Sequence, residues 1–227
     1  RQIMLDADLV ARKLGYAAGQ DLILHLPLRY QDETRLTPLR DVRLGVDVLV
    51  EGVVIHAEVQ MRPRRQLLVE IADSTSPASA RLYFRLLHFY PSQLNQLQPG
   101  VRVRLFGEVK PGFFGAEMVH PQLRVVRDNT PLPATLTPVY PAVAAFSQNA
   151  VRKAVEMTLQ HADLGETLPA ALLARLQLPG FGEALLALHH PPPDADLRAL
   201  EGHATPAWRR IKFDELLAQQ LSLRLAA

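Results

Sequence analysis

The sequence predicts an α+β protein in which a five-stranded β-barrel lies between an N-terminal and a C-terminal helical segment. Apolar residues recur at helical spacing up to about residue 45 and again beyond residue 126, whereas the interval between them alternates with a period of two. A short helical stretch interrupts the alternating interval after its third strand. The predicted regions are therefore 1–45, 46–126 and 127–227.

The N-terminal region is predicted to hold two short helices. Apolar residues at helical spacing indicate the first, namely Ile3, Leu5, Leu9, Val10 and Leu14. Gly15 follows and is expected to end it, because glycine is common directly after a helix. A second helix is expected over 20–26, where Pro27 stops it.

The middle region is predicted to form the barrel. Three strands are indicated by alternating apolar residues over 47–59, 66–73 and 81–87. A helix is then expected over 92–97, and two more strands over 101–109 and 116–126. Three strands, a helix and two strands are the order of the oligonucleotide-binding (OB) fold, and the position of the helix favours that fold over other small barrels.

The C-terminal region turns helical again after a proline-rich connection over 130–141. Helices are predicted over 147–161, 169–176, 182–189 and 205–227, with Ser147 as an N-cap. Apolar residues lie on or near one face of the last helix, namely Ile211, Leu216, Leu217, Leu221 and Leu225. Because this helix reaches Ala227 without a C-cap, we expect the natural protein to continue beyond it.

Composition limits the class of protein. The chain has 227 residues, 48% of them hydrophobic, which is enough for a core, and it has no cysteine for disulfides or thiolate metal sites. No apolar run approaches the roughly 18 residues of a membrane span, and the charged N-terminus does not resemble a signal peptide. The formal net charge is only +2, but just four of the 25 cationic residues are lysines. Arginine binds phosphate in a bidentate manner, so this bias is compatible with a nucleic-acid ligand.

An OB barrel binds its ligand on strands two and three and on the loops that join strands one–two and four–five. Cations in these places would contact phosphates, and aromatic rings would stack on unpaired bases. The candidate residues are Arg62, Arg64 and Arg65 in the first loop; Lys110, Phe113 and Phe114 in the second; Arg81, Tyr83 and Arg85 on strand three; and Phe89 and Tyr90 after it. We expect both loops to meet at a single rim, although arginines in a turn are often merely solvated.

Catalytic motifs are not found. None of the four lysines follows a glycine, so the sequence has no phosphate-binding Gly-Lys-Ser/Thr loop. Asp214 and Glu215 are expected on a helix rather than at a strand end, and the pair His189-His190 has no third zinc ligand nearby in sequence. His120 falls in a predicted strand and is interpreted as an ordinary polar position. The chain is therefore expected to be non-catalytic by itself.

Several segments in order resemble the N-terminal part of the RecG family of ATP-dependent DNA helicases. These segments are Leu26–Asp32, Phe106–Lys110 with Gly115–Pro121, Leu136–Pro141, His190–Pro193 and the helix around Arg209–Leu223. The resemblance implies an OB-fold wedge domain that binds stalled replication forks and Holliday junctions and splits their arms. A separate motor would supply ATP hydrolysis with magnesium, giving fork regression and branch migration in DNA repair and recombination.

The resemblance also implies the setting of the protein. The fragment itself would hold no cofactor, and its partners would be branched DNA and the motor domains of the same chain. We expect a monomer in the bacterial cytoplasm, associated with the nucleoid and not with a membrane. Two alternatives stay open: an OB-fold module that binds protein, and an OB domain that binds RNA.

One departure from the family affects the site. Relatives tend to place aromatic residues at the end of the third strand, where they stack on bases at the junction, whereas this chain has Leu86, Leu87 and His88 there. Either the stacking role has moved to Phe89, Tyr90 or the tip at 113–114, or Leu87 acts as a blunter apolar wedge.

Overall fold

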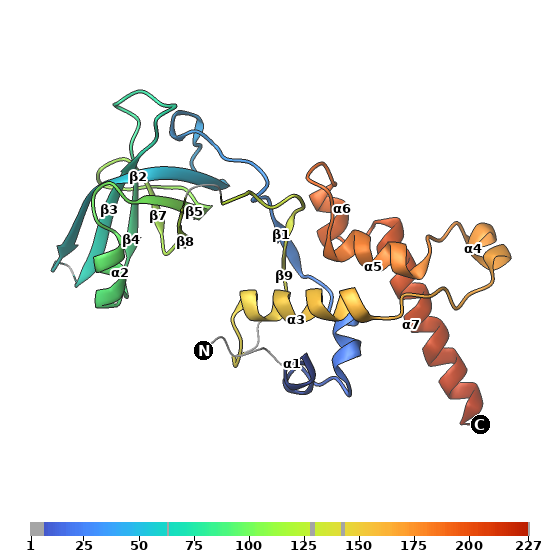
Figure 1. Cartoon of the computed structure of the whole chain (residues 1–227). Helices are drawn as coiled ribbons and strands as arrows, with labels where there is room; N and C mark the ends of the chain where they lie inside the picture. Colours follow the sequence, from blue (N-terminus) through green and yellow to red (C-terminus); the bar gives the residue numbers. More distant parts are fainter. Residues whose placement is uncertain (1–6, 63, 128–129, 142–143, 227) are drawn as a thin grey trace. The chain divides into compact units, whose positions relative to one another are not determined.

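The computed structural model describes residues 7–62, 64–127, 130–141 and 144–226 (Figure 1). It consists of two compact units. The sheet unit comprises residues 32–133, and the helical unit combines the residues up to Gln31 with those from Ala134 onward. Segments from both ends of the sequence therefore fold together. The three regions predicted from the sequence, 1–45, 46–126 and 127–227, are divided differently from these two units, and their boundaries remain predictions.

In the described part of the sheet unit, seven strands hydrogen-bond in the order β6-β7-β4-β3-β2-β5-β8. Their bounds are β2 (Asp47–Gln60), β3 (Gln66–Ala72), β4 (Leu82–Leu86), β5 (Arg102–Glu108), β6 (Lys110–Pro111), β7 (Ala116–Val119) and β8 (Gln122–Val125). Strands β2, β3, β4 and β5 agree with the predicted strands to within one or two residues. Helix α2 (Pro91–Gln96) lies between β4 and β5 in the sequence, as predicted.

The predicted strand over 116–126 is wrong in one respect, because His120 and Pro121 divide it into β7 and β8. The backbone of His120 is left-handed, with φ of 50°, and Pro121 has no amide proton to continue a ladder. Strand β7 pairs in parallel with β4, and β8 pairs antiparallel with β5. A two-residue break thus connects one side of the sheet to the other, and the mixed sheet curls (Figure 1).

The curled sheet encloses one hydrophobic core. Alternate residues of β3 and β4 point inward, including Leu67, Val69 and Phe84, which are fully buried. Leu97, which follows α2, is also buried in this core. Strand β2 pairs with both β3 and β5, and at Gly52 the strands lie so close that a Cβ atom would stand 2.9 Å from the carbonyl oxygen of Ala72.

The helical unit is built from short elements of both chain ends. Its elements are α1 (Ala7–Lys13), the 3-10 helix η1 (Gly19–Leu24), β1 (Arg29–Gln31), β9 (Thr137–Val139), α3 (Gln148–His161), α4 (Ala170–Leu176), α5 (Phe181–His189), α6 (Leu197–Glu201) and α7 (Pro206–Leu225). Ser147 caps α3 as predicted, by accepting a hydrogen bond from the amide of Ala150. Ile3 and Leu5, assigned to the first helix, lie outside the described residues.

Two parts of this unit were not predicted. Strands β1 and β9 form an antiparallel pair that joins the N-terminal segment to the C-terminal one. Each has three residues, which is too short for a period of two to be recognised. Helix α6 has five residues and is capped by Asp196, whose carboxylate accepts hydrogen bonds from the amides of Arg198 and Ala199.

No single described helix is long and apolar enough to cross a membrane. Helices α4 and α5 reach that length and composition only as a pair bent by 55°. Helix α5 buries Ala184, Leu185 and Leu188 within the helical unit.

A buried histidine ties the two ends of the chain together. His189 at the end of α5 is 1% exposed, and its Nε2 lies 2.8 Å from the carbonyl oxygen of Ile23 in η1. A carbonyl can only accept, so Nε2 carries a proton. Burial lowers the pKa of His189 to about 4, so the ring is neutral at pH 7. In the neutral ring Nδ1 accepts a hydrogen bond from the hydroxyl of Tyr140 at 2.8 Å.

We expect the helical unit to lose stability as the pH falls from about 6.5 toward 4. In that window unfolded His189 binds a proton and folded His189 does not, so the free energy of unfolding drops by about 1.4 kcal/mol per pH unit. Between pH 7 and 5 the loss should reach about 2 kcal/mol in urea titrations.

The variant His189→Gln should show a shallower pH dependence over the same window, whatever its stability at pH 7. The control is His161→Gln, which removes an exposed histidine of α3 and should leave the slope unchanged. An unchanged slope in His189→Gln would contradict this assignment.

Candidate nucleic-acid interface

The loop between β2 and β3 carries the predicted cations. Arg62 and Arg64 are exposed and make no hydrogen bond or ion pair with another described residue, whereas Pro63 lies outside the described residues. The guanidinium of Arg65 lies 4.3 Å from the ring centroid of Phe89. Met61, at the start of the loop, is 67% exposed. The loop thus offers two unpaired cations and a third that stacks on an aromatic ring.

The second predicted loop is a tight hairpin that joins β6 to β7. The amide of Gly112 donates to the carbonyl of Gly115 at 2.7 Å, and this leaves Phe113 and Phe114 at the tip. Phe113 is 90% exposed, and its ring meets that of Phe114 edge-on at 4.9 Å. Lys110 forms an exposed ion pair with Glu108 at 3.1 Å. The tip is therefore an exposed aromatic surface beside a weakly paired cation.

A row of side chains on β4 connects the two loops. Leu82, Phe84 and Leu86 fill the core, so Tyr83, Arg85 and, just beyond the strand, Leu87 belong to the opposite face, as the alternation predicts. The ring of Tyr83 lies 5.6 Å from that of Phe114. Burial, and then the nearby carboxylate of Glu70, raise the pKa of Tyr83, so its hydroxyl stays protonated.

The two arginines of this row are held by carboxylates. Arg81 pairs with Glu70 at 2.9 Å, and Arg85 pairs with Glu117 of β7 at 2.8 Å. The second pair is largely buried, since its side chains are 14% and 10% exposed. Arg85 also donates to the side chain of Gln60 at 3.1 Å. These pairs could not be predicted from the sequence, because the acidic partners lie on neighbouring strands, 11 and 32 positions away in the chain.

Phe89 and Tyr90 differ in their surroundings. Phe89 packs against the core of the sheet unit beneath Arg65, whereas Tyr90 is 75% exposed next to the start of α2. Of the predicted aromatic residues, Phe113 and Tyr90 present the most free ring surface, and Phe89 presents less.

The candidate residues form two groups and do not meet at one rim. Phe113 and Phe114 lie beside Tyr83 near the beginning of β4, whereas Arg65 and Phe89 lie beyond its end. Four residues separate Tyr83 from Leu87, which corresponds to about 13 Å of extended strand. The expected single rim is thus corrected to a row with an aromatic tip at one end and a cationic loop at the other.

Other candidates have structural partners. Asp214 pairs with Arg210 one turn earlier on α7 at 2.9 Å, and His190 pairs with Glu156 at 2.7 Å. Among the described residues, no three His, Asp or Glu side chains gather as a metal site would require. These side chains thus have ion-pair partners within the described parts of the chain.

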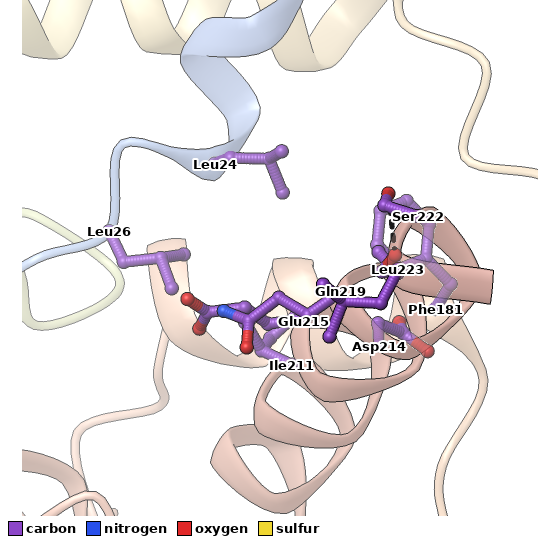
Figure 2. Close-up of a pocket in the computed structure, with 10 residues that line it drawn as sticks. Leu24, Leu26, Phe181, Ile211, Asp214, Glu215, Gln219, Ser222 and Leu223 are labelled. Atoms are coloured by element: carbon purple, nitrogen blue, oxygen red, sulfur yellow. Dashed lines mark hydrogen bonds between the residues drawn. The ribbon is translucent and has the colours of Figure 1, made fainter. Parts of the chain in front are cut away.

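The helical unit has a separate apolar groove of about 1020 Å³ along α7 (Figure 2). Figure 2 shows Leu24 and Leu26 across from Ile211 and Gln219 of α7. Four leucines on the second half of α7 are more than half exposed, namely Leu216 (60%), Leu221 (51%), Leu223 (66%) and Leu225 (89%). The apolar face predicted for this helix exists, but described residues cover it only near Ile211 and Leu217.

The first half of α7 is anchored by Arg210, whose side chain is fully buried. Its guanidinium donates twice to Glu166, at 2.7 and 2.8 Å, and to the carbonyl oxygen of Pro179 at 2.9 Å. The hydrogen bonds from Arg210 hold the pKa of Glu166 at about 2, well below its usual range. This bidentate pair fixes the base of the helix, whereas the described residues leave most of its far half exposed.

Comparisons with known proteins agree on one family. Residues 6–162 match the RecG wedge domain. The chain is 40% identical over 217 residues to the ATP-dependent DNA helicase RecG of Pasteurella multocida, and 41% identical to that of Escherichia coli K12. In both cases the match covers 93% of this chain and 30% of the relative, so the chain spans about a third of their length.

A solved structure has the same fold. "Structure of RecG bound to three-way DNA junction" superposes with a TM-score of 0.64 over 93% of this chain and 28% of that one, at 24% sequence identity.

We expect Arg85 to be required for stability, unlike the loop arginines. Arg85→Ala should lower the free energy of unfolding by about 3 kcal/mol, because it leaves Glu117 largely buried without its cation. Arg64→Ala, at an exposed position, should change it by less than about 0.5 kcal/mol. The double variant Arg85→Leu/Glu117→Leu should regain much of the loss, since no charge remains buried. Urea unfolding measures all three, and equal values for Arg85→Ala and Arg64→Ala would disprove the distinction.

Proposed function

Because the chain belongs to the RecG wedge domain family, we propose that it is the part of a larger DNA helicase that binds branched DNA. Its targets are stalled replication forks and Holliday junctions, and its action is to hold their arms apart during fork regression and branch migration. The observation that carries this proposal is the row on β4, with exposed cations beyond one end and exposed aromatic rings at the other.

The curled sheet acts as an OB barrel in this proposal. Strand β2 pairs with both β3 and β5, β4 pairs in parallel with β7, and α2 lies between β4 and β5 in the sequence. In OB folds the face of the second and third strands and the two adjoining loops take the nucleic acid. Here that surface corresponds to β3, β4, the loop at 61–65 and the hairpin at 112–115.

Cationic and aromatic side chains have different roles on this face. Arg62 and Arg64 have no competing carboxylate among the described residues and are free to contact phosphates. Phe113 and Tyr90 offer exposed rings on which unpaired bases can stack. The centre of the row is neutralised by Glu70 and Glu117, which supports contacts at its two ends rather than along its length.

Strand separation by this unit is passive. A rigid barrel blocks the path of the parental duplex, and aromatic side chains stabilise the last bases that come unpaired. Arginines direct the two single strands away from each other. The free energy for movement comes from a motor outside this chain, and the wedge lowers the cost of the unpaired state.

The motor is the other partner in this proposal. The relatives are about three times as long as the chain, which leaves room for motor domains that bind ATP and magnesium. The present residues do not fit these ligands, since the sequence has no Gly-Lys-Ser/Thr loop. The exposed leucines of α7 and the groove beside them support a contact of the helical unit with the motor.

We place the protein in the bacterial cytoplasm with the nucleoid, where such DNA is found, and expect it to act as a monomer. The named relatives are bacterial proteins, which supports this location.

The chain should bind a fork or four-way junction more tightly than linear duplex. Fluorescence anisotropy with these ligands, single-stranded DNA and single-stranded RNA measures the preference directly. Equal affinity for fork and duplex would refute the proposal. Tighter binding of single-stranded RNA would instead favour an RNA-binding domain, and no binding at all would favour a protein-interaction module.

The variant Phe113→Ala tests how the preference arises. Loss of a stacking ring costs roughly 1–3 kcal/mol per base, so the ratio of fork to duplex affinity should fall about fivefold or more. The control is Met157→Ala on α3 of the helical unit, which removes an exposed apolar side chain that is not aromatic and should leave the ratio unchanged.

Removing the loop cations should weaken binding to every DNA. Arg62→Ala, Arg64→Ala and Arg65→Ala combined should reduce the slope of log affinity against log salt by about two to three, since each phosphate contact contributes about 0.9. The matched control changes three exposed arginines of the helical unit, Arg12, Arg175 and Arg224, and so removes the same net charge. If both triple variants lose the same slope, the loop is not the binding site.

A further inference from the structure

A second groove of the helical unit lies between α3 and the residues around the ends of β9 and α5. Its volume is about 430 Å³, which is within the range of small-molecule sites. Its lining includes Pro138, Tyr140, Arg152, Lys153, Leu159 and His190. Two segments that resemble the RecG family, Leu136–Pro141 and His190–Pro193, meet here through a hydrogen bond from the amide of Leu136 to the carbonyl oxygen of Pro191 at 2.9 Å. The proposed function uses neither segment.

The floor of this groove is uncharged at pH 7. Burial raises the pKa of Tyr140, so its hydroxyl stays protonated and donates to Nδ1 of His189 at 2.8 Å. Burial also lowers the pKa of His189 to about 4, which keeps that ring neutral. Pro138 and Leu159 add apolar surface. A ligand group that enters the groove therefore meets a mainly apolar lining, which favours a flat, uncharged ring over a charged group.

Two cations stand beside the apolar lining. Arg152 donates from Nε to the carbonyl oxygen of Pro138 at 2.7 Å and from Nη1 to Oδ1 of Asn149 at 2.9 Å, and both of these oxygens are neutral. Lys153 is exposed and makes no hydrogen bond or ion pair with another described residue. Because Arg152 is bonded to Pro138, a cation and an apolar wall are adjacent, as the phosphate and the base of one nucleotide are.

The carboxylate of the same groove is engaged by other residues. Glu156 lies one turn after Arg152 on α3. Its Oε2 accepts a hydrogen bond from Nε2 of His190 at 2.7 Å, and its Oε1 accepts one from the side chain of Gln160 at 3.1 Å. The first of these bonds also holds the ring of His190 at the groove. An anionic ligand group can therefore pair with Arg152 and Lys153.

We propose that this groove binds a nucleotide with a terminal phosphate, either a free nucleoside monophosphate or the phosphorylated 5′ end of a DNA strand. The phosphate contacts Arg152 and Lys153, and the base lies against Pro138 and stacks on the ring of His190. A phosphate monoester carries nearly two negative charges at pH 7, which two cations match, whereas a phosphodiester within a strand carries one. Imidazole is among the rings on which bases stack. The site belongs to the helical unit and does not depend on the proposed function.

Calorimetric titration of the 227-residue chain tests the two halves of the ligand. Deoxyadenosine monophosphate should bind. Deoxyadenosine, which has no phosphate, and deoxyribose 5-phosphate, which has no base, should each bind at least about fivefold more weakly. If the monophosphate does not bind at millimolar concentration, the proposal is overturned. If deoxyribose 5-phosphate binds as tightly as the monophosphate, the groove takes an anion only and the proposal is equally wrong.

A short oligothymidine with or without a 5′ phosphate distinguishes the two sources of the ligand. If only the phosphorylated strand displaces deoxyadenosine monophosphate, the groove takes the end of a DNA strand. If neither strand displaces it, the ligand is the free nucleotide. Equal displacement by both strands would show that a terminal phosphate is not recognised, which contradicts the proposal.

Substitution of Lys153 tests the location of the site. Lys153→Gln should weaken binding of the monophosphate about tenfold and leave the weak binding of deoxyadenosine unchanged, because only the phosphate loses a contact. Lys153→Arg keeps the charge and should retain most of the affinity. The matched control is Lys212→Gln, which removes an exposed lysine of α7 whose Nζ donates to the carbonyl oxygen of His203. If Lys153→Gln binds the monophosphate as tightly as Lys212→Gln does, the ligand does not bind in this groove and the proposal fails.

Discussion

The sheet unit depends on one constraint: a single stretch of chain must pair with both sides of the same curled sheet. Residues 116–125 meet it by leaving β4 at Val119 and joining β5 at Gln122, with His120 and Pro121 between them. Proline cannot continue a ladder, and a left-handed residue before it turns the chain sharply. A uniform strand would continue along β4 and leave β5 without its second partner. The residue that makes this turn also faces the end of β4, so closure of the sheet and order at the candidate interface have the same origin.

Charge pairing on the outward face separates stability from binding. An unpaired arginine in the middle of a sheet loses hydration without compensation, so the fold supplies Glu70 and Glu117 as partners. These carboxylates also neutralise the two arginines, so the centre of the face does not attract phosphates. Exposed loops carry no such penalty, because water solvates their cations, and Arg62 and Arg64 can remain unpaired there. Unpaired arginines are therefore found in the exposed loop and not in the middle of the sheet. The cationic surface that a ligand could use follows from the free-energy cost of burying an unpaired arginine.

The sequence predicted long, periodic elements well and contacts across strands poorly. The alternation in β2, β3, β4 and β5 and the N-cap of α3 could be predicted locally, since each depends on neighbours within a few residues. The break at His120 could have been suspected from Pro121, but apolar residues continue on both sides. The pairing of Arg85 with Glu117, the stack of His88 on His120 and the strands β1 and β9 join residues that are at least 32 positions apart. Local patterns carry no information on such partners. The sequence therefore predicted the types of residue at the candidate site better than their arrangement in space.

Helix α7 combines the strongest anchor of the helical unit with its least covered surface. Arg210 is buried among Glu166, Asp214 and the carbonyl of Pro179, so the first turns cannot shift without exposing unpaired charge. Beyond Leu217 the described residues cover almost nothing, and leucines face solvent. The helical stretch beyond Leu217 is too short to be stable by itself in water, which makes the anchored end the support for it. A rigid helix with an uncovered apolar face suits the transfer of force, because a partner bound there would move the helical unit as one body. The passive wedge that we propose would require such a connection, since strand separation would need work from elsewhere in the protein.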